Sequence, residues 1–191
     1  MTLSLKSLRG RPLAARDGTI GAIVDVYLDD RDWTVRHFVF DTGKPMPQRQ
    51  VLVPPSAVTA DLRTDLTRVQ LEHCHEVEED PPLYLQHDVA AHPYRGDPHL
   101  RSMEVLSGYA VMATDGAAGQ LKDLRADADG WRIVALEIDT GLWFPGRRVL
   151  LAPSDVAGTE WLERRLRVRL SRQELRGEKR RAEDRAVERV T

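Results

Sequence analysis

An internal duplication is the feature that most limits what this 191-residue chain can fold into. Shifted by 98 positions, residues 4–58 align without a gap with residues 102–156, and about 20 of the 55 aligned positions are identical. Many of the shared residues are Asp, Gly and Pro, which specify turns rather than a reaction. The duplication therefore predicts two equivalent units of about 75 residues each, here called copy one and copy two.

Short strands separated by turns are predicted in both copies. An Asp-Gly pair, which suits a tight hairpin, occurs at Asp17-Gly18 and again at Asp115-Gly116. Ile23 breaks an otherwise alternating apolar pattern and indicates a bulge near Gly21. The expected strands are 11–15, 19–29, 35–40, 51–53 and 66–71 in copy one, and 109–113, 120–126, 133–138, 149–151 and 166–170 in copy two. This pattern predicts a mainly β fold of two tandem small antiparallel β-barrels.

The chain divides into four expected regions. Residues 1–75 and 101–171 form the two barrel domains, and residues 76–100 form an acidic, proline-containing linker. Residues 172–191 form a basic C-terminal helix, because Ser171 and Glu174 have the spacing of a capping box and the following residues favour helix.

Charge is distributed unevenly along the chain. Residues 72–99 carry seven acidic groups and one Arg, whereas residues 163–191 carry eleven basic and six acidic groups. This asymmetry is typical of two solvated segments that attract each other, and also of a nucleic-acid or membrane-surface contact. A single cysteine, Cys74, and the lack of any long apolar run favour a cytoplasmic protein without disulfides, whose membrane contacts are at most peripheral.

Both copies resemble the PRC-barrel family. The pattern Asp-Gly-x-x-Gly-x-hydrophobic-x-Asp spans Asp17–Asp25 in copy one and Asp115–Asp123 in copy two. A basic-Val-hydrophobic strand end follows at Arg49–Pro54, and the matching stretch of copy two runs from Asp139 to Leu151. The resemblance implies small β-barrels like those of the photosynthetic reaction-centre H subunit and of the C-terminal half of ribosome-maturation factors. It also implies a domain that is not itself an enzyme.

A doubled Asp-Thr-Gly triplet, at residues 41–43 and 139–141, is the strongest catalytic pattern in the chain. Aspartic proteases place one such triplet in each of two related lobes, so that two carboxylates share a proton. Lys44 and Leu142 stand where that pattern requires Ser or Ala, and Glu137 places a charge in one supporting strand. We therefore interpret both triplets as turns and predict no catalytic residues.

Metal and cofactor sites are not predicted either. His73, Cys74 and His75 offer zinc ligands, but the spacing matches no established zinc motif, so a solvated acidic segment with incidental histidines is favoured. The glycines at positions 18 and 21 lie in a hairpin rather than between a strand and a helix, which argues against a phosphate-binding loop.

Two groups of residues are predicted as possible partner contacts. Trp143, Phe144, Arg147 and Arg148 combine aromatic and guanidinium groups on one loop, a composition common in interfaces and in base stacking, although the aromatic pair could equally cover a barrel end. Arg165, Arg167 and Arg169 alternate with apolar residues and would line one face of a strand, there to meet phosphates or the acidic linker.

The sequence thus favours a non-catalytic protein-interaction or scaffold module without a cofactor. An RNA- or ribosome-associated assembly factor is the alternative, and a peripheral component of a photosynthetic reaction-centre-type membrane complex is a third possibility. Exposed strand edges are also compatible with a homodimer.

Overall fold

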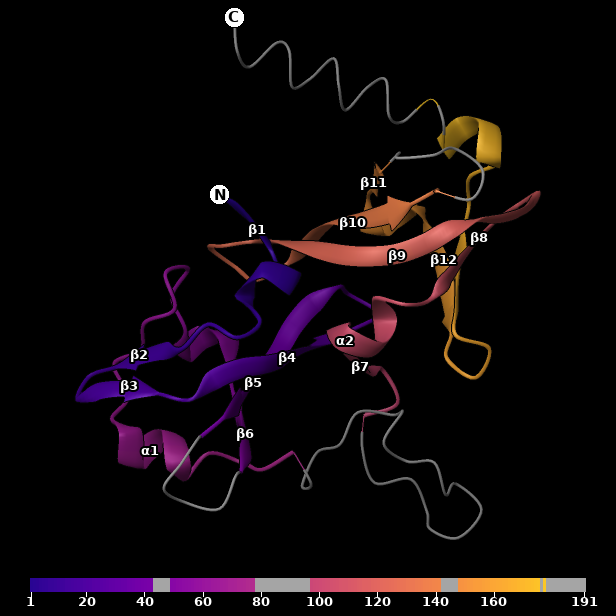
Figure 1. Cartoon of the computed structure of the whole chain (residues 1–191). Coiled ribbons are helices and arrows are strands. Elements are labelled where there is room, and N and C mark those ends of the chain that lie inside the picture. Colours follow the sequence, from indigo (N-terminus) through magenta and orange to yellow (C-terminus); the bar gives the residue numbers. More distant parts are fainter. Residues whose placement is uncertain (43–48, 78–96, 142–147, 176, 178–191) are drawn as a thin grey trace, which may run out of the picture. The chain divides into compact units, whose positions relative to one another are not determined.

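The computed structural model describes residues 1–42, 49–77, 97–141, 148–175 and 177. The protein is mainly β, as predicted, and divides into two compact units (Figure 1). Unit 1 comprises Met1–Glu104 and Ala126–Arg132, and unit 2 comprises Val105–Arg125 and Ile133–Thr191. Because residues 126–132 belong to copy two in sequence, each unit is not simply one copy of the repeat.

Unit 1 is built on an antiparallel sheet with the strand order β6-β5-β4-β7. A separate hairpin, β2-β3, turns at the predicted Asp-Gly site. The elements of this unit are β1 (Thr2–Ser4), η1 (Lys6–Leu8), β2 (Leu13–Ala15), β3 (Gly18–Ile20), β4 (Ala22–Asp29), β5 (Thr34–Asp41), β6 (Gln50–Val53), η2 (Pro55–Ala57), α1 (Arg68–Glu72) and β7 (Leu100–Ser102).

Unit 2 contains a sheet with the order β11-β10-β9-β8-β13-β12, in which β13 runs parallel to β8. Its elements are β8 (Ala110–Ala113), β9 (Gly116–Asp127), β10 (Ile133–Asp139), β11 (Arg148–Leu151), η4 (Pro153–Asp155), β12 (Val156–Glu160) and β13 (Arg165–Val168), and α2 (Met103–Leu106) precedes them. Within the described residues neither sheet closes on itself, so the two closed barrels stay a prediction. No helix in the described part of the chain is long and apolar enough to cross a bilayer.

The shared glycines of the repeat allow two strands to approach each other closely. Gly21 and Gly119 both adopt positive φ, and a Cβ at either position would lie 1.7 Å and 2.3 Å, respectively, from the carbonyl oxygens of Asp41 and Asp139. Only glycine fits there. In copy one the chain leaves the strand at Gly21, between β3 and β4, and the expected bulge is a register shift between Ile23 and Asp25.

One predicted strand, 66–71, is wrong: Arg68–Glu72 form the helix α1 with Thr67 as its N-cap. Thr67 accepts a hydrogen bond from the backbone N–H of Gln70, whose side chain bonds back to the N–H of Thr67. Asp17 also accepts from the N–H of Arg68 at 2.8 Å. This capping chemistry outweighs the apolar spacing of the segment.

Copy two repeats the same helix cap, six residues later than the 98-residue offset of the duplication would place it. Ser171 and Glu174 bond reciprocally, and Asp115 accepts from the N–H of Arg172 at 2.9 Å. Residues 172–175 and 177 are helical, and the rest of the predicted helix 172–191 lies outside the described residues. The duplication therefore continues to Leu71 and Leu175, with a longer β12-β13 hairpin inserted in copy two.

Unit 1 is completed by residues that belong to copy two. Strand β7 pairs with β4, and the ring of Trp131 packs edge-on against Phe38 with centroids 4.7 Å apart. The indole N–H of Trp131 donates to the carbonyl of Val58 at 3.0 Å, and Trp131 is only 4 % exposed. Copy one consequently does not complete its core from its own residues.

Candidate functional site

The predicted contact residues fall in different parts of unit 2. Trp143, Phe144 and Arg147 lie outside the described residues. Arg148 begins β11 and its side chain is 70 % exposed. It faces the same side of the strand as Leu150, because the burial of β11 alternates between exposed and buried residues. Arg148 therefore belongs to a sheet face, described below.

The predicted arginine stripe is present on β13. Arg165, Arg167 and Arg169 are exposed, while Leu166 and Val168 between them are buried. Two of the three guanidinium groups already have partners within unit 2. Arg167 pairs with Glu160 on the adjacent strand, and Arg169 donates to the main-chain carbonyls of the η4 region, at Ser154 and Val156. These bonds reduce the positive charge that the stripe offers to phosphates.

A buried carboxylate marks one face of β9, β10 and β11. Glu137 on β10 is only 3 % exposed, and both of its oxygens are bound by guanidinium groups. Arg125 donates to Oε2 at 2.9 Å, and Arg148 donates to Oε1. Burial alone would raise the pKa of Glu137, but the two guanidinium partners outweigh it and hold that pKa below its ordinary value. Glu137 is therefore ionised at neutral pH.

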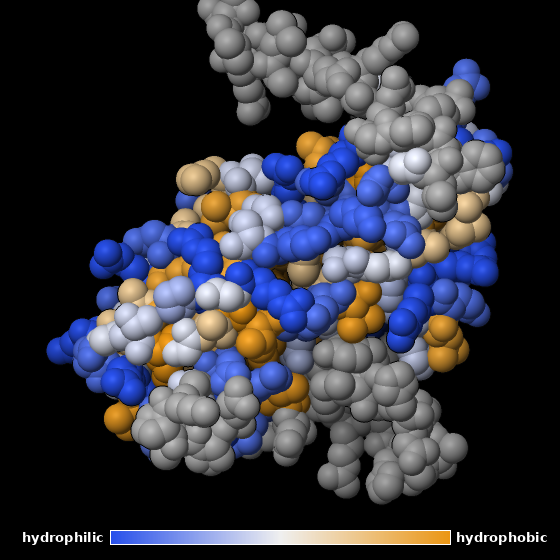
Figure 2. Space-filling model, in the orientation of Figure 1, coloured by the Kyte–Doolittle hydropathy of each residue, from blue (hydrophilic) through white to orange (hydrophobic). Residues whose placement is uncertain are grey.

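The rest of this face is polar or accessible. Lys122 on β9 is half-buried, and Leu150 on β11 is 38 % exposed. We call the side of the sheet formed by Lys122, Arg125, Glu137, Arg148 and Leu150 the Arg125 face. On the side of the molecule drawn in Figure 2, apolar residues form separate areas among hydrophilic ones, so broad apolar surface is not the feature that distinguishes this protein there.

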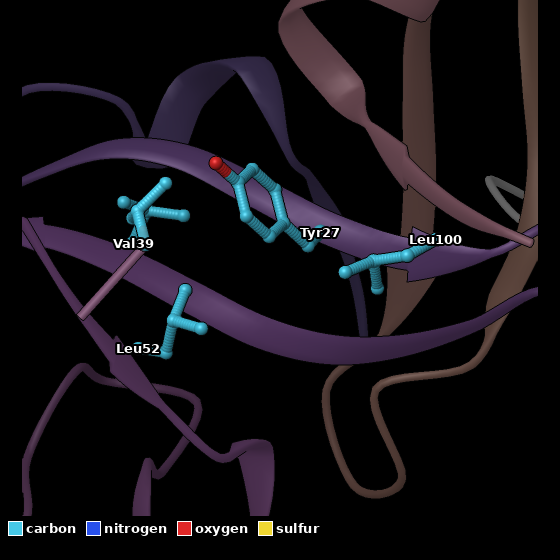
Figure 3. Close-up of a cluster of buried hydrophobic side chains, with 5 residues drawn as sticks. Tyr27, Val39, Leu52 and Leu100 are labelled. Carbon is cyan, nitrogen blue, oxygen red and sulfur yellow. The ribbon is translucent and has the colours of Figure 1, made fainter. Parts of the chain in front are cut away.

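The matching face of copy one has the opposite chemistry. Tyr27, Val39 and Leu52 occupy the positions of Arg125, Glu137 and Leu150, and they form a buried cluster with Val77 and Leu100 (Figure 3). We call it the Tyr27 face. Each of its five residues is at most 8 % exposed. The strand registers are the same, since Val39 pairs with Leu52 and Glu137 pairs with Leu150.

A segment at the predicted junction of copy one and the linker covers the edge of the Tyr27 face. The N–H of Leu52 donates to the carbonyl of His75 at 2.7 Å, and the N–H of Val77 donates to the carbonyl of Gln50 at 3.1 Å. Residues 75–77 therefore extend the sheet beyond β6, with a bridge between Val51 and Glu76. The segment also places Val77 over the apolar cluster.

The second Asp-Thr-Gly triplet ends in a turn at Gly141, whereas Gly43 of the first triplet lies outside the described residues. Asp41 and Asp139 end β5 and β10, and their carbonyls face Gly21 and Gly119 as described above. The carboxylate of Asp139 accepts from the N–H of Gly141 at 2.9 Å, a bond that closes a local turn. In copy two, the triplet thus has the turn role that the sequence predicts.

A second buried carboxylate, Asp25, joins β7 to β4. It accepts hydrogen bonds from the hydroxyl of Ser102 and from the backbone N–H groups of Glu104, at 3.1 Å, and Val26, at 2.8 Å. Burial raises the pKa of Asp25, and these hydrogen bonds oppose the shift. Because all of these partners lie in unit 1, we interpret Asp25 as a structural residue that connects β4 to β7 and to the start of α2.

His73 and Cys74 of the histidine and cysteine cluster follow α1, and His75 begins the segment that pairs with β6. His73 caps the helix and its Nδ1 lies 2.7 Å from the carbonyl of Val69, while the thiol of Cys74 contacts the carbonyl of Gln70. Burial raises the pKa of the Cys74 thiol, so it stays protonated at neutral pH. Among the described residues, no group of three or more potential ligands is placed to hold a metal ion.

Sequence reasoning missed the Arg125 face as a unit. Glu137 was conspicuous only as a charge in a strand, and Arg125 and Lys122 were not singled out. The signal was the comparison of the copies, in which Tyr27, Val39 and Val24 are replaced by Arg125, Glu137 and Lys122. The chain matches no protein-family model and no curated protein sequence.

Proposed function

We propose that this chain is a non-catalytic protein-interaction module, with two tandem small β-barrels of the PRC-barrel type, in which the Arg125 face contacts a protein partner. The repeated Asp-Gly-x-x-Gly-x-hydrophobic-x-Asp pattern and the mainly β structure support the family assignment. The shared residues account for turns and close strand contacts, so they leave little that would need a catalytic explanation.

The observation that carries the proposal is the difference between the two sheet faces. The Tyr27 face is sealed by residues 75–77, whereas the Arg125 face keeps Arg148 70 % exposed and Leu150 38 % exposed. Arginine is enriched in protein interfaces and among the residues that contribute most to binding. Divergence of one copy at these positions, while the turns stayed the same, supports a role in recognition.

An RNA- or ribosome-associated role is the alternative, and it depends on the arginine stripe. Arg167 and Arg169 are bound within unit 2, so the stripe offers fewer free cations than the sequence indicates. The balance therefore favours a protein partner. The third possibility, a peripheral partner of a reaction-centre-type membrane complex, rests on the family resemblance and would be recognised by the identity of the partner.

Site-specific crosslinking in the cells that make the protein tests the proposal. A photoreactive benzoylphenylalanine replaces Leu150 on the Arg125 face or, as a control, Leu162, which is 74 % exposed. We expect a discrete protein adduct from position 150 that resists nuclease treatment and that position 162 does not give. A nuclease-sensitive adduct would favour the RNA alternative, and equal labelling at both positions would remove the Arg125 face as the contact surface.

A further inference from the structure

The sheet edge in unit 2 is the counterpart of one that unit 1 covers. In copy one, the outward-pointing N–H of Leu52 and carbonyl of Gln50 bond to residues 75–77. Strand β11 ends the sheet of unit 2, and its register with β10 matches that of β6 with β5. The N–H of Leu150 and the carbonyl of Arg148 therefore point outward from β11.

These two backbone groups have no hydrogen-bond partner among the described residues. An edge strand with unpaired N–H and C=O groups can accept another extended chain. In copy one, the matching edge strand β6 accepts such an extended segment, with one backbone hydrogen bond on each side of the bridge between Val51 and Glu76. The backbone of unit 2 thus offers the same docking geometry.

The side chains beside this edge select what can dock there. Where Val77 packs on Tyr27 and Val39, an added strand in unit 2 would meet Arg125 and Glu137. Three cations, Lys122, Arg125 and Arg148, lie on or beside this face together with two carboxylates, Glu137 and Asp139, because Asp139 is paired with Arg148 across β10 and β11. Glu137 is only 3 % exposed and the Asp139 carboxylate accepts from the N–H of Gly141, whereas Arg148 is 70 % exposed beside the edge. The accessible charge is therefore positive, and the complementary side chains of an incoming strand are carboxylates.

The chain's own sequence at the matching positions does not meet this requirement. The helix caps of the two copies are offset by 104 residues, so the counterparts of residues 75–77 are Lys179, Arg180 and Arg181. The sequence His75-Glu76-Val77, which covers the edge in copy one, is therefore not repeated in copy two.

We propose that the β11 edge binds an extended acidic segment of a partner protein by β-strand addition. The N–H of Leu150 donates to the added strand, the carbonyl of Arg148 accepts from it, and carboxylates of the strand pair with Arg125 and Arg148. This inference rests on the proposed function, because it specifies how the Arg125 face recognises its partner.

Peptide binding to the full-length chain tests strand addition. The probe is a fluorescein-labelled peptide of about eight residues that alternates Glu and Val, which is the length of a typical strand. The matched peptides alternate Lys and Val, or carry N-methyl groups that remove backbone donors. We expect anisotropy titrations to show that each change weakens binding by about tenfold or more.

Two protein variants separate the backbone contribution from the charge contribution. Leu150→Pro removes the outward N–H at an edge where proline is tolerated, and Arg148→Gln removes a cation. Both should weaken the Glu-Val peptide by about tenfold, whereas Arg165→Gln on β13 should leave its affinity unchanged. Amide exchange measured by NMR should slow at Leu150 when the peptide is bound, and circular dichroism checks that each variant is folded.

Three results would overturn the inference. Equal affinity for the N-methylated peptide or for Leu150→Pro would mean charge attraction without strand addition. Binding that arises only after Glu78, Glu79 and Asp80 are changed to Gln or Asn would assign the edge to the chain's own acidic linker. Absence of all peptide binding would remove the acidic-strand mode. The crosslinking experiment at position 150 then shows independently whether the proposed protein contact stands.

Discussion

The two sheet faces show how a duplicated fold can keep its framework and change its surface. Gly21 and Gly119, with Asp41 and Asp139, make the same close strand contact in both copies. Tyr27 and Val39 on one face, however, correspond to Arg125 and Glu137 on the other. The two glycines are retained because any other residue there would distort the backbone. The residues that differ are side chains on one face of the sheet, where a substitution does not change the backbone path.

The two faces also differ in how completely each is covered. Residues 75–77 seal the Tyr27 face through backbone bonds and the side chain of Val77. On the Arg125 face, Glu137 is buried and bound by two arginine side chains. One face thus contributes apolar burial to stability, and the other keeps charge accessible at its edge.

Exchanging the chemistry of the two faces should give the largest effect. Val39→Glu places an unpaired carboxylate at a fully buried position and should lower the free energy of unfolding by about 3–5 kcal/mol. Glu137→Val is the matched change, and it should cost less than about 1 kcal/mol, since Arg125 and Arg148 are 39 % and 70 % exposed and stay hydrated. Urea unfolding of both variants checks the difference, and similar losses would contradict it.

Proline at the two edge positions should distinguish a covered edge from a free one. Leu52→Pro removes the bond to His75 and disturbs the buried cluster, so we expect a loss of about 2–3 kcal/mol. Leu150→Pro removes an N–H that has no partner in the described part of the chain and should cost less than about 1 kcal/mol. Thermal unfolding measures both, and a large loss for Leu150→Pro would show that this edge is already occupied.

Most strands of copy two were predictable because their local patterns agree with their environment, but β12 and the parallel pairing of β13 with β8 were not predicted. The alternation in Arg165–Val168 matches the buried and exposed faces of β13, and Val149–Leu151 matches most of β11. The prediction for residues 66–71 was wrong because the spacing of apolar Leu66 and Leu71 resembles that of a strand, whereas Thr67 and Gln70 form a helix cap. Capping residues were a better guide there than hydrophobic spacing.

The candidate site was only partly predictable, because its meaning depends on contacts distant in sequence. Arg148 was identified from its loop composition, but Arg125 and Glu137 meet it only through the pairing of β9, β10 and β11. The insertion of Trp131 beside Phe38 was likewise not predicted. Its recurrence as Trp33 and Trp131 in a repeat dominated by turn residues was the available signal.

Lowering the pH should destabilise unit 1 through Asp29, a carboxylate whose counterpart in copy two has different partners. Asp29 is buried and bound by Arg31 and Arg36, and the hydrogen bonds from Arg31 lower its pKa to about 2. The unfolded pKa is about 3.9, so the unfolded state takes up the proton first and stability falls as pH drops from about 4 to 2. Asp29→Asn should remove this part of the pH dependence and cost about 2 kcal/mol at neutral pH.

The matching residue in copy two provides the control for that measurement. Asp127 is 3.8 Å from the α-amino group of Met1, and both groups are partly exposed. Asp127→Asn should therefore change stability by less than about 0.5 kcal/mol. Urea unfolding between pH 3 and pH 7 tests both variants, and an equal pH dependence for Asp29→Asn and the unsubstituted chain would mean that the Arg31 pair contributes nothing.

The smallest effect on stability should accompany the sharpest effect on recognition. Arg148→Gln removes an exposed partner of Glu137, while Arg125 still binds the other carboxylate oxygen, so unfolding should change by less than about 1 kcal/mol. The same variant should lose the crosslinked protein adduct formed from position 150, because it removes the most exposed cation of the Arg125 face. Arg165→Gln is the matched control and should keep the adduct. An adduct that survives Arg148→Gln would mean that the divergence of the two faces serves stability rather than a partner.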